Sequence, residues 1–258
     1  NGNGWGQRYP VIAKMVQYHD FDIFGTQECF IHQLKDMKEA LPGYDYIGVG
    51  RDDGKEKGEH SAIFYRTDKF DVIEKGDFWL SETPDVPSKG WDAVLPRICS
   101  WGHFKCKDTG FEFLFFNLHM DHIGKKARVE SAFLVQDKMK ELGKGKELPA
   151  ILTGDFNVDQ THQSYDAFVS KGVLCDSYEK AGFRYAINGT FNNFDPNSFT
   201  ESRIDHIFVS PSFQVKRYGV LTDTYRSIVG KGEKKQANDC PEEIDIKTYQ
   251  ARTPSDHF

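Results

Sequence analysis

Residues 150–157 read Ala150-Ile151-Leu152-Thr153-Gly154-Asp155-Phe156-Asn157. The apolar first half predicts a buried β-strand, and Gly154 marks the point where the strand gives way to polar residues. Because side chains alternate between the two faces of a strand, Asp155 and Asn157 are expected on the same face. The stretch therefore predicts a buried strand that presents two polar side chains together at its end.

The same pattern occurs upstream, in Phe116-Asn117-Leu118-His119-Met120-Asp121. Alternation places Asn117, His119 and Asp121 on one face of a strand that is otherwise made of Phe and Leu. Strand ends also meet water and acquire polar residues for that reason alone. One such strand therefore leaves a structural and a functional interpretation equally open.

Three further segments carry residues of the same chemical kind. The apolar run 21–28 ends in Glu28, Asp205 begins the strand-like run 205–209, and Ser255-Asp256-His257 lies near the end of the chain. Each of these could arise by chance, but their joint recurrence favours a functional site built from several strand ends.

Helical and extended patterns alternate along the rest of the chain. Helices are expected after Pro10, over 30–41 and over 125–142. Further strands are expected at 45–49, 60–66, 70–79, 97–106, 111–121, 149–154 and 204–210. Helices separated by several consecutive strands predict an α/β fold with two packed sheets and helices outside. No repeat or linker is found, so residues 1–258 are expected to form a single domain, with the polar stretch 223–253 as a surface loop or insertion.

The composition excludes several classes of protein. With 21 Phe, 11 Tyr and 4 Trp among 258 residues, the chain can fill a sizeable core. No apolar run approaches the ~20 residues needed to span a bilayer, so no transmembrane helix is expected. The 33 basic and 39 acidic residues give a net charge of −6, which excludes a protein that holds polyanions by bulk positive charge. The five cysteines form no Cys-x-x-Cys pair, and only a Cys99–Cys106 disulfide stays open.

The residue types at the strand ends are those that phosphoester hydrolysis requires. Carboxylates hold a hard cation, which neutralises the phosphoryl oxygens and the leaving oxygen. An Asp beside the attacking water acts as a base, and Asn and His donate hydrogen bonds as charge develops. The sequence has no Gly-x-Ser-x-Gly motif, which argues against a serine hydrolase.

In this order, five motifs resemble the endonuclease/exonuclease/phosphatase superfamily: Gln27-Glu28, Asn117-Leu118-His119, Gly154-Asp155-Phe156-Asn157, Arg203-Ile204-Asp205 and Ser255-Asp256-His257. The resemblance covers nearly the whole chain, and residues 48–54 and 78–84 further resemble a bacterial branch of that superfamily. It implies a four-layer α-β-β-α sandwich of two packed mixed sheets with helices outside. It also implies a phosphoesterase that depends on Mg²⁺ or Mn²⁺.

The resemblance assigns the metal and the attacking water to four residues. Glu28 is expected to be the principal metal ligand, with Asp256 near the metal or a second metal position. Asp155 is expected to orient or deprotonate the water, and Asn157 to hold a phosphoryl oxygen.

The phosphate group is assigned to a second set of residues. The resemblance implies that His257 pairs with Asp205 beside the phosphate. It implies that His119 contacts the phosphate and pairs with Glu59. It also implies that Arg97 clamps the phosphate.

Two further residues are candidates for substrate binding. Asn117 is a candidate donor to the substrate. Arg51 either contacts substrate or closes a turn with Asp52 or Asp53.

The sequence departs from the family pattern at both ends of the chain. The family's first strand, with its metal-site Asn, does not precede Trp5, and no final strand follows Phe258. We therefore expect that the printed chain is trimmed at both ends. The compartment is not readable from the sequence, and secretion or a periplasmic location stays open.

The sequence favours a phosphodiesterase of nuclease type, acting as an endonuclease or exonuclease by in-line attack of water. The alternative is a phosphomonoesterase or phospholipase-type hydrolase that acts on inositol, sugar or lipid phosphates. Residues 203–206 lack the aromatic-Cys-Asp-Arg segment of the inositol 5-phosphatase branch, whereas the net charge of −6 disfavours a nuclease. A remote alternative is a non-catalytic binding module on the same fold. The expected partner is a phosphoester substrate, and no obligate protein partner is evident.

Overall fold

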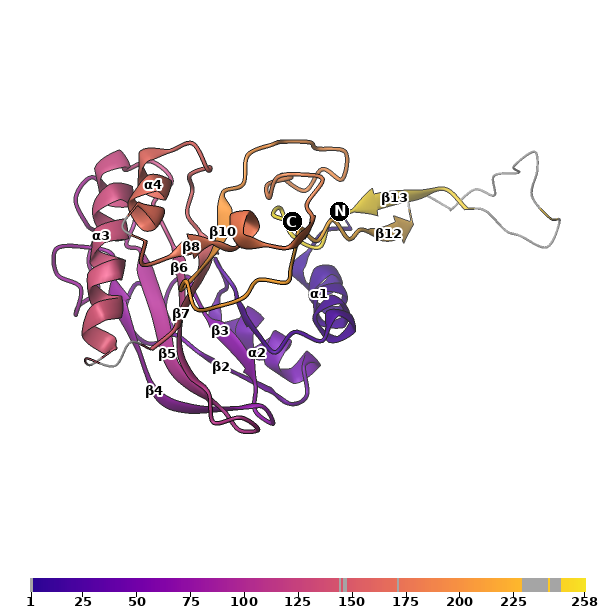
Figure 1. Ribbon diagram of the computed structural model, residues 1–258. Helices are drawn as coiled ribbons and strands as arrows, with labels where there is room; N and C mark the ends of the chain where they lie inside the picture. Colours follow the sequence, from indigo (N-terminus) through magenta and orange to yellow (C-terminus); the bar gives the residue numbers. More distant parts are fainter. Residues whose placement is uncertain (1, 144, 146–147, 171, 229–240, 242–246) are drawn as a thin grey trace.

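Two β-sheets lie face to face in the middle of the molecule, and helices cover both outer sides (Figure 1). The computed structural model describes residues 2–143, 145, 148–170, 172–228, 241 and 247–258. The layers follow in the order of two helices, the larger sheet, the smaller sheet and two more helices. The predicted four-layer α-β-β-α sandwich is therefore confirmed.

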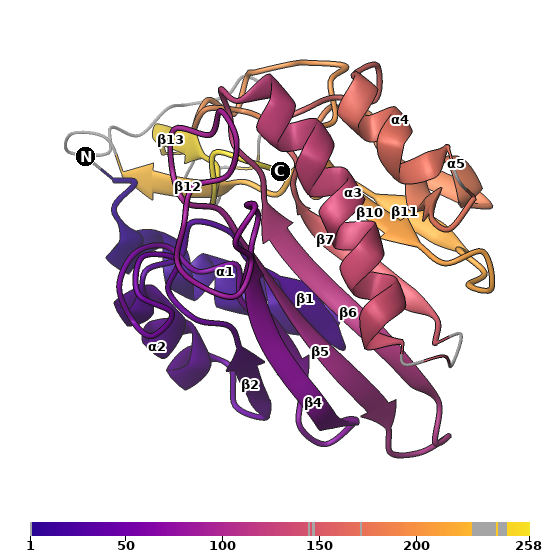
Figure 2. The same cartoon turned by 90° about the vertical axis from the view of Figure 1, so that its left-hand side faces the viewer.

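The larger sheet has six strands in the order β4-β5-β6-β7-β10-β8. Its strands are β4 (Phe70–Trp79), β5 (Ile98–Cys106), β6 (Glu112–His119), β7 (Ala150–Asp155), β10 (Asp205–Val209) and β8 (Cys175–Asp176). Neighbouring strands are antiparallel except β6 and β7, which run parallel. Helix α3 (Lys125–Leu142) makes the crossover between that parallel pair and lies against the outer face of the sheet (Figure 2).

The smaller sheet has three antiparallel strands in the order β1-β3-β2. They are β1 (Ile23–Gly25), β3 (Ile63–Arg66) and β2 (Tyr44–Ile47). Helices α1 (Trp5–His19) and α2 (Ile31–Ala40) cover its outer face (Figure 1).

Three apolar cores separate the four layers. Phe116 and Leu152 of the larger sheet pack with Val135 of α3 in the first core. Phe104 and Ile63 meet in the second core, between the two sheets. The third core lies beneath α1 and α2 and contains residues of both helices, of β3 and of the position just before β3: Ala13, Val16, Leu34, Met37, Ala62 and Phe64. The central strands β5 and β6 therefore have two buried faces, which explains why they are so rich in large apolar residues.

Strand register places the polar strand ends next to one another. His119 of β6 is opposite Asp155 of β7, and Asp155 is opposite Asp205 of β10. Directly opposed residues have Cβ atoms ~4.5–5.5 Å apart on one face of a sheet. The expectation that several strand ends build one site therefore agrees with the register.

The last third of the chain adds short elements at one end of the sandwich. They are α4 (Gln163–Val169), α5 (Ser177–Lys180), the parallel pair β9 (Phe183–Tyr185) and β11 (Arg217–Gly219), and the antiparallel pair β12 (Tyr225–Ile228) and β13 (Tyr249–Arg252). The sequence predicts a surface loop or insertion over 223–253. Because β12 and β13 pair at the two ends of this stretch, the loop is corrected there, and the insertion stays a prediction. Residues 229–240 and 242–246 of that stretch lie outside the described residues.

The structure excludes the disulfide that the sequence left open. Cys99 and Cys106 are both free. They lie on the same strand, β5, seven residues apart, and at ~3.3 Å per residue the strand holds them too far apart for a disulfide. Among the described residues, no helix combines the length and the apolar character that crossing a membrane would require.

Candidate active site

A cavity of about 440 Å³ opens where β6 and β7 end. Its lining residues come from distant parts of the chain: Glu28, Glu59, Leu95, Arg97, His119, His122, Asp155, Asn157, Phe191, Ile204, Asp256 and His257. Eight of the eleven residues predicted for the site are among them, and Asp205, Asn117 and Arg51 are not. The volume falls within the ~300–1,000 Å³ of typical small-molecule sites.

Asp205 lies behind the cavity and acts on His257. Its Oδ2 is 2.8 Å from Nδ1 of His257. Burial opposes the charged imidazole, but the hydrogen bond and charge of Asp205, together with the charges of Asp155 and Asp256, raise the pKa of His257 to about 9. The ring is therefore a cation at neutral pH, and it lines the cavity while Asp205 holds its far nitrogen.

Asp155 is the most deeply buried acid of the cavity, with its side chain 7% exposed. Burial, and then the negative charge of Asp205, raise the pKa of Asp155 to about 7. The backbone N–H of Asn157 donates to its Oδ1 over 2.8 Å and fixes the orientation of the carboxyl group. A carboxyl group with a pKa near 7 is suited to accept a proton at neutral pH.

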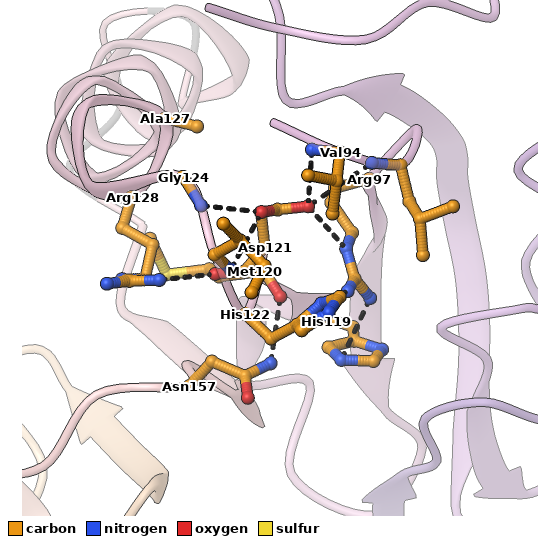
Figure 3. A network of polar contacts seen from close by, with 12 residues as sticks. Val94, Arg97, His119, Met120, Asp121, His122, Gly124, Ala127, Arg128 and Asn157 are labelled. Atoms are coloured by element: carbon orange, nitrogen blue, oxygen red, sulfur yellow. Dashed lines mark hydrogen bonds and ion pairs between the residues drawn. The ribbon is translucent and has the colours of Figure 1, made fainter. Parts of the chain in front are cut away.

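The guanidinium of Arg97 lies between two imidazoles (Figure 3). Its Nη1 is 2.9 Å from Nε2 of His119, and its Nη2 is 3.0 Å from Nδ1 of His122. Arginine only donates hydrogen bonds, so both of these ring nitrogens accept and both rings are neutral. Burial, and then the positive charges of Arg97 and Arg51, lower the pKa of His119 well below its ordinary range, in agreement with this assignment.

Glu59 pairs mainly with Arg51. Its Oε2 accepts from Nη1 over 2.5 Å and its Oε1 from Nη2 over 3.0 Å, a bidentate arrangement. The predicted pairing of Glu59 with His119 is weaker, because Oε2 lies 4.0 Å from Nδ1 of that ring. Arg51 is 8% exposed and does not line the cavity. Of the two roles left open for Arg51, the structure favours the structural one: its guanidinium pairs with Glu59, and its Nε lies 3.9 Å from Oδ1 of Asp52.

The prediction that Asn117 donates a hydrogen bond to the substrate is also corrected. Its side chain is fully buried, and Nδ2 donates to the carbonyl oxygens of Thr26 and Ala62, over 2.8 and 3.0 Å. Oδ1 accepts from Nε2 of Gln27 and Oγ1 of Thr153, over 2.7 and 2.9 Å. These four bonds use the full capacity of the amide, so it joins the two sheets and has no group left for a substrate.

Glu28 and Asn157 are held in unusual backbone conformations. Their φ angles are 59° and 51°, in the left-handed region that few residues other than glycine adopt. Both residues line the cavity. Strained backbone of this kind persists where the surrounding structure enforces it, and it clusters at functional sites.

The acidic side of the cavity fits a hard cation. Partial burial, and then the charges of Glu59 and Asp256, raise the pKa of Glu28, which shows that negative charges crowd one another there. Ligand atoms of Glu28, Glu59 and His119 lie within 4.8 Å of one another. Glu59 is engaged by Arg51, and Nε2 of His119 by Arg97, so Glu28 is the member of this group best able to bind a cation. Its carboxylate is 62% exposed and oxygen ligands suit Mg²⁺ or Mn²⁺.

A second group of possible ligand atoms lies on the other side of the cavity. It consists of Asp155, Asp205 and His257, again within 4.8 Å of one another. The hydrogen bond between His257 and Asp205 already uses two of these three residues. The first group therefore fits a cation better than the second.

The cavity also has an apolar wall, which the sequence does not predict. Leu95, Phe191 and Ile204 form it. The ring of Phe191 packs edge-on against His257 at a centroid distance of 5.2 Å, and a β-bridge joins the two residues. Leu95 and Phe191 stand in segments without periodicity, so no pattern distinguishes them. Ile204 begins the run expected as a strand at 204–210, where alternation alone does not indicate that it lines a cavity. His122 also lines the cavity.

The fold and the site together define a class. Two stacked sheets that bring carboxylates, a charged histidine and a buried arginine into one cavity are typical of enzymes that hydrolyse phosphoesters. The chain belongs to the Endonuclease/Exonuclease/phosphatase family, whose model matches residues 1–257. The sequence-based assignment to this superfamily is thereby confirmed, and the protein is a phosphoesterase of that family.

Three relatives show how close the match is, the first two of them with solved structures. The chain is 86% identical to a protein named mannosyl-6-phosphatase from Bacteroides thetaiotaomicron, with a TM-score of 0.92, over 100% of this chain and 90% of that one. It is 41% identical to an endonuclease/exonuclease/phosphatase protein from Bacteroides vulgatus, with a TM-score of 0.82, over 85% of each chain. A Ccr4 3′-5′-exoribonuclease subunit from Debaryomyces hansenii is 23% identical over 98% of this chain, which spans 34% of that protein.

Proposed function

We propose that this protein is a phosphomonoesterase that removes the phosphate group from hexose 6-phosphates, with a mannose 6-phosphate group as the first candidate. The observation that carries the proposal is the 86% identity, over the whole chain, to a protein named mannosyl-6-phosphatase. The proposal replaces the sequence-based prediction of a phosphodiesterase of nuclease type. The relative named as an exoribonuclease subunit is only 23% identical, and a net charge of −6 disfavours contact with long nucleic acids.

The cavity suits a small phosphorylated sugar. It has an apolar wall of Leu95, Phe191 and Ile204 and a charged wall that includes Arg97 and His257. The C–H face of a pyranose ring packs against apolar and aromatic side chains, whereas a phosphate group needs charged hydrogen-bond donors. The two walls therefore match the two halves of a hexose phosphate.

In this proposal Glu28, with Asp256 beside it, holds one Mg²⁺ or Mn²⁺ ion. A bound cation of this type neutralises negative charge on the phosphoryl oxygens. The raised pKa of Glu28 supports the assignment, because partial burial and the charges of Glu59 and Asp256 both favour a positive ion at this carboxylate.

Asp155 is the proposed base. A water molecule attacks phosphorus and gives one proton to Asp155 as the bond between phosphorus and the sugar oxygen breaks. The leaving sugar oxygen takes up one proton from solvent and Asp155 releases its proton to solvent, which gives free sugar and inorganic phosphate. The N–H of Asn157 holds the carboxyl group of Asp155 in place for this transfer. The pKa of about 7 supports the role, because a carboxyl group of this strength is partly ionised at neutral pH and still basic enough to take a proton.

Arg97 and His257 are the proposed donors to the phosphoryl oxygens. His257 is a cation because Asp205 holds its Nδ1, and Arg97 is fixed by its contacts with His119 and His122. Preorganised charged donors of this kind stabilise the charge that develops in the transition state. In the free protein, His119 orients Arg97 through Nε2.

The proposal is tested with a substrate panel at pH 7.5 in the presence of MgCl₂ or MnCl₂. The panel contains mannose 6-phosphate, glucose 6-phosphate, bis(p-nitrophenyl) phosphate, single-stranded DNA and RNA. We expect release of inorganic phosphate from the hexose phosphates and its loss in EDTA. Cleavage of the diester or the nucleic acids without any release from hexose 6-phosphates would refute the proposal.

A further inference from the structure

Asp121 lies two residues after the end of β6, and its carboxylate accepts hydrogen bonds from two separate loops (Figure 3). Oδ1 accepts from the backbone N–H groups of Ile123 and Gly124, over 3.0 and 2.7 Å. Oδ2 accepts from those of Val94 and Leu95, over 3.2 and 3.3 Å. Asp121 is only 2% exposed, so one buried carboxylate ties the segment that leads to Arg97 to the turn before α3.

The same carboxylate faces the back of the Arg97 guanidinium. Oδ2 of Asp121 lies 3.5 Å from Nε, and the side chains of the two residues are 1% and 4% exposed. Nε is the end of the guanidinium opposite the two Nη atoms, which contact His119 and His122. Arg97 is therefore held from behind by a charge and in front by two neutral rings.

The two loops held by Asp121 both contribute to the cavity. Leu95 and Arg97 line it from one loop, and His122 lines it from the other, whereas Asp121 itself does not. A carboxylate outside the cavity thus fixes residues of both its charged wall and its apolar wall.

We propose that Asp121 is a positioning residue that acts through Arg97: it holds the guanidinium and residues 94–97 in the orientation that receives the phosphate group of the substrate. This inference rests on the proposed function, which supplies the phosphate group. It adds a residue to that function which has no contact with the cavity.

The chemistry of the carboxylate indicates the informative substitution. Asp121→Asn keeps the size of the side chain but replaces one acceptor oxygen by an NH₂ group. In one orientation of the amide that group faces the N–H groups of Val94 and Leu95 and Nε of Arg97. In the other orientation it faces the N–H groups of Ile123 and Gly124. Donors then face donors in a buried place, so the substitution disturbs the loops in either case.

A double-mutant cycle tests whether this disturbance acts through Arg97. Binding of inorganic phosphate is measured by isothermal titration calorimetry at a fixed MgCl₂ concentration, for the unmodified protein, Asp121→Asn, Arg97→Ala and the double variant. We expect Asp121→Asn to raise the Kd for phosphate about tenfold when Arg97 is present and less than twofold when it is replaced. An equal rise in both backgrounds would overturn the inference, because Asp121 would then act independently of Arg97.

Arg128→Met is the matched control. Nη1 of Arg128 donates to the backbone oxygen of Asp121 over 2.9 Å, so its loss loosens the same turn without touching the carboxylate. Its effect on phosphate binding is expected to be the same with and without Arg97. Coupling with Arg97 as large as that of Asp121→Asn would show that general loosening explains the result, and would also overturn the inference.

Two measures keep the experiment decisive. If Asp121→Asn does not give folded protein, Asp121→Glu takes its place in the same cycle, because it keeps the charge and displaces it by one methylene group. Phosphate binding needs no turnover, so the two proposals can fail separately. A protein that shows the coupling but hydrolyses no hexose phosphate would refute the proposed function and support the role of Asp121.

Discussion

Replacing Asp155 by Asn should make the cation-free protein more stable while removing its activity. The reason is that an ionised carboxylate is expensive at this position: burial and the charge of Asp205 raise its pKa from 3.8 to about 7. Asn has nearly the same shape, and its Oδ1 still accepts from the N–H of Asn157. The substitution therefore removes the cost of the charge with little change in packing.

The magnitude follows from the pKa. Each tenfold change in proton affinity corresponds to ~1.4 kcal/mol, so a rise from 3.8 to about 7 sets an upper limit of ~4 kcal/mol at pH 8. Asp205 and His257 share this electrostatic balance, and we expect about half of the limit, ~2 kcal/mol. The folded-state pKa lies above the unfolded one, so the cost is absent below pH ~4, grows as the pH rises to ~7 and then stays constant.

The assay is urea unfolding in EDTA at pH 8 and at pH 5. At pH 8 the free energy of unfolding of Asp155→Asn should exceed that of the unmodified protein, and at pH 5 the difference should fall to less than half. Asp137→Asn is the control, because it removes the same charge from a side chain that is 73% exposed and should change stability by less than ~0.5 kcal/mol. A variant that is no more stable at pH 8, or equally stabilised at both pH values, would refute the reasoning.

Three other substitutions have expected outcomes. Glu28→Gln should reduce the Mg²⁺-dependent release of phosphate from mannose 6-phosphate at least a hundredfold, measured as rate against MgCl₂ concentration; unchanged Mg²⁺ dependence would exclude Glu28 as the ligand. Gly25→Ala should lower the free energy of unfolding by ~2–4 kcal/mol, because the new Cβ would lie 2.2 Å from Oδ1 of Asn117; urea unfolding within ~0.5 kcal/mol of the unmodified protein would contradict this. Phe191→Ala should raise the KM for mannose 6-phosphate about tenfold and leave the inhibition constant of inorganic phosphate unchanged; equal effects on both would show that Phe191 does not recognise the sugar.

The strand ends could be predicted because their signal is local. Alternation along 116–121 and 150–157 needs only the period of a β-strand, and the register of β6 and β7 then brings His119 and Asp155 together. Alternation does not predict how deeply a side chain on the expected face is buried or what it contacts. Asn117 is on the expected face, but its contacts with Gln27 and Thr153 depend on how the two sheets meet.

The loops could not be predicted for a different reason. Leu95 and His122 owe their places to the carboxylate of Asp121, whose hydrogen-bond donors lie up to 27 residues away. Phe191 owes its place to the chain near His257, where the carbonyl oxygen of Asp256 accepts from two consecutive backbone N–H groups of the 191–193 segment. No pattern within a short window records contacts of this range.

The hydrogen bond between Asp205 and His257 has a consequence for how the protein acquires activity. The two residues are 52 positions apart, and the segment that carries His257 is also tied to α1, since Nη1 of Arg8 donates to the carbonyl oxygen of Pro254 across 246 positions. Contacts of such long range cost the most chain entropy and form late in folding. We therefore expect that a refolding chain regains its sheets, as seen by circular dichroism, before it regains turnover, so that catalysis reports completion of the fold.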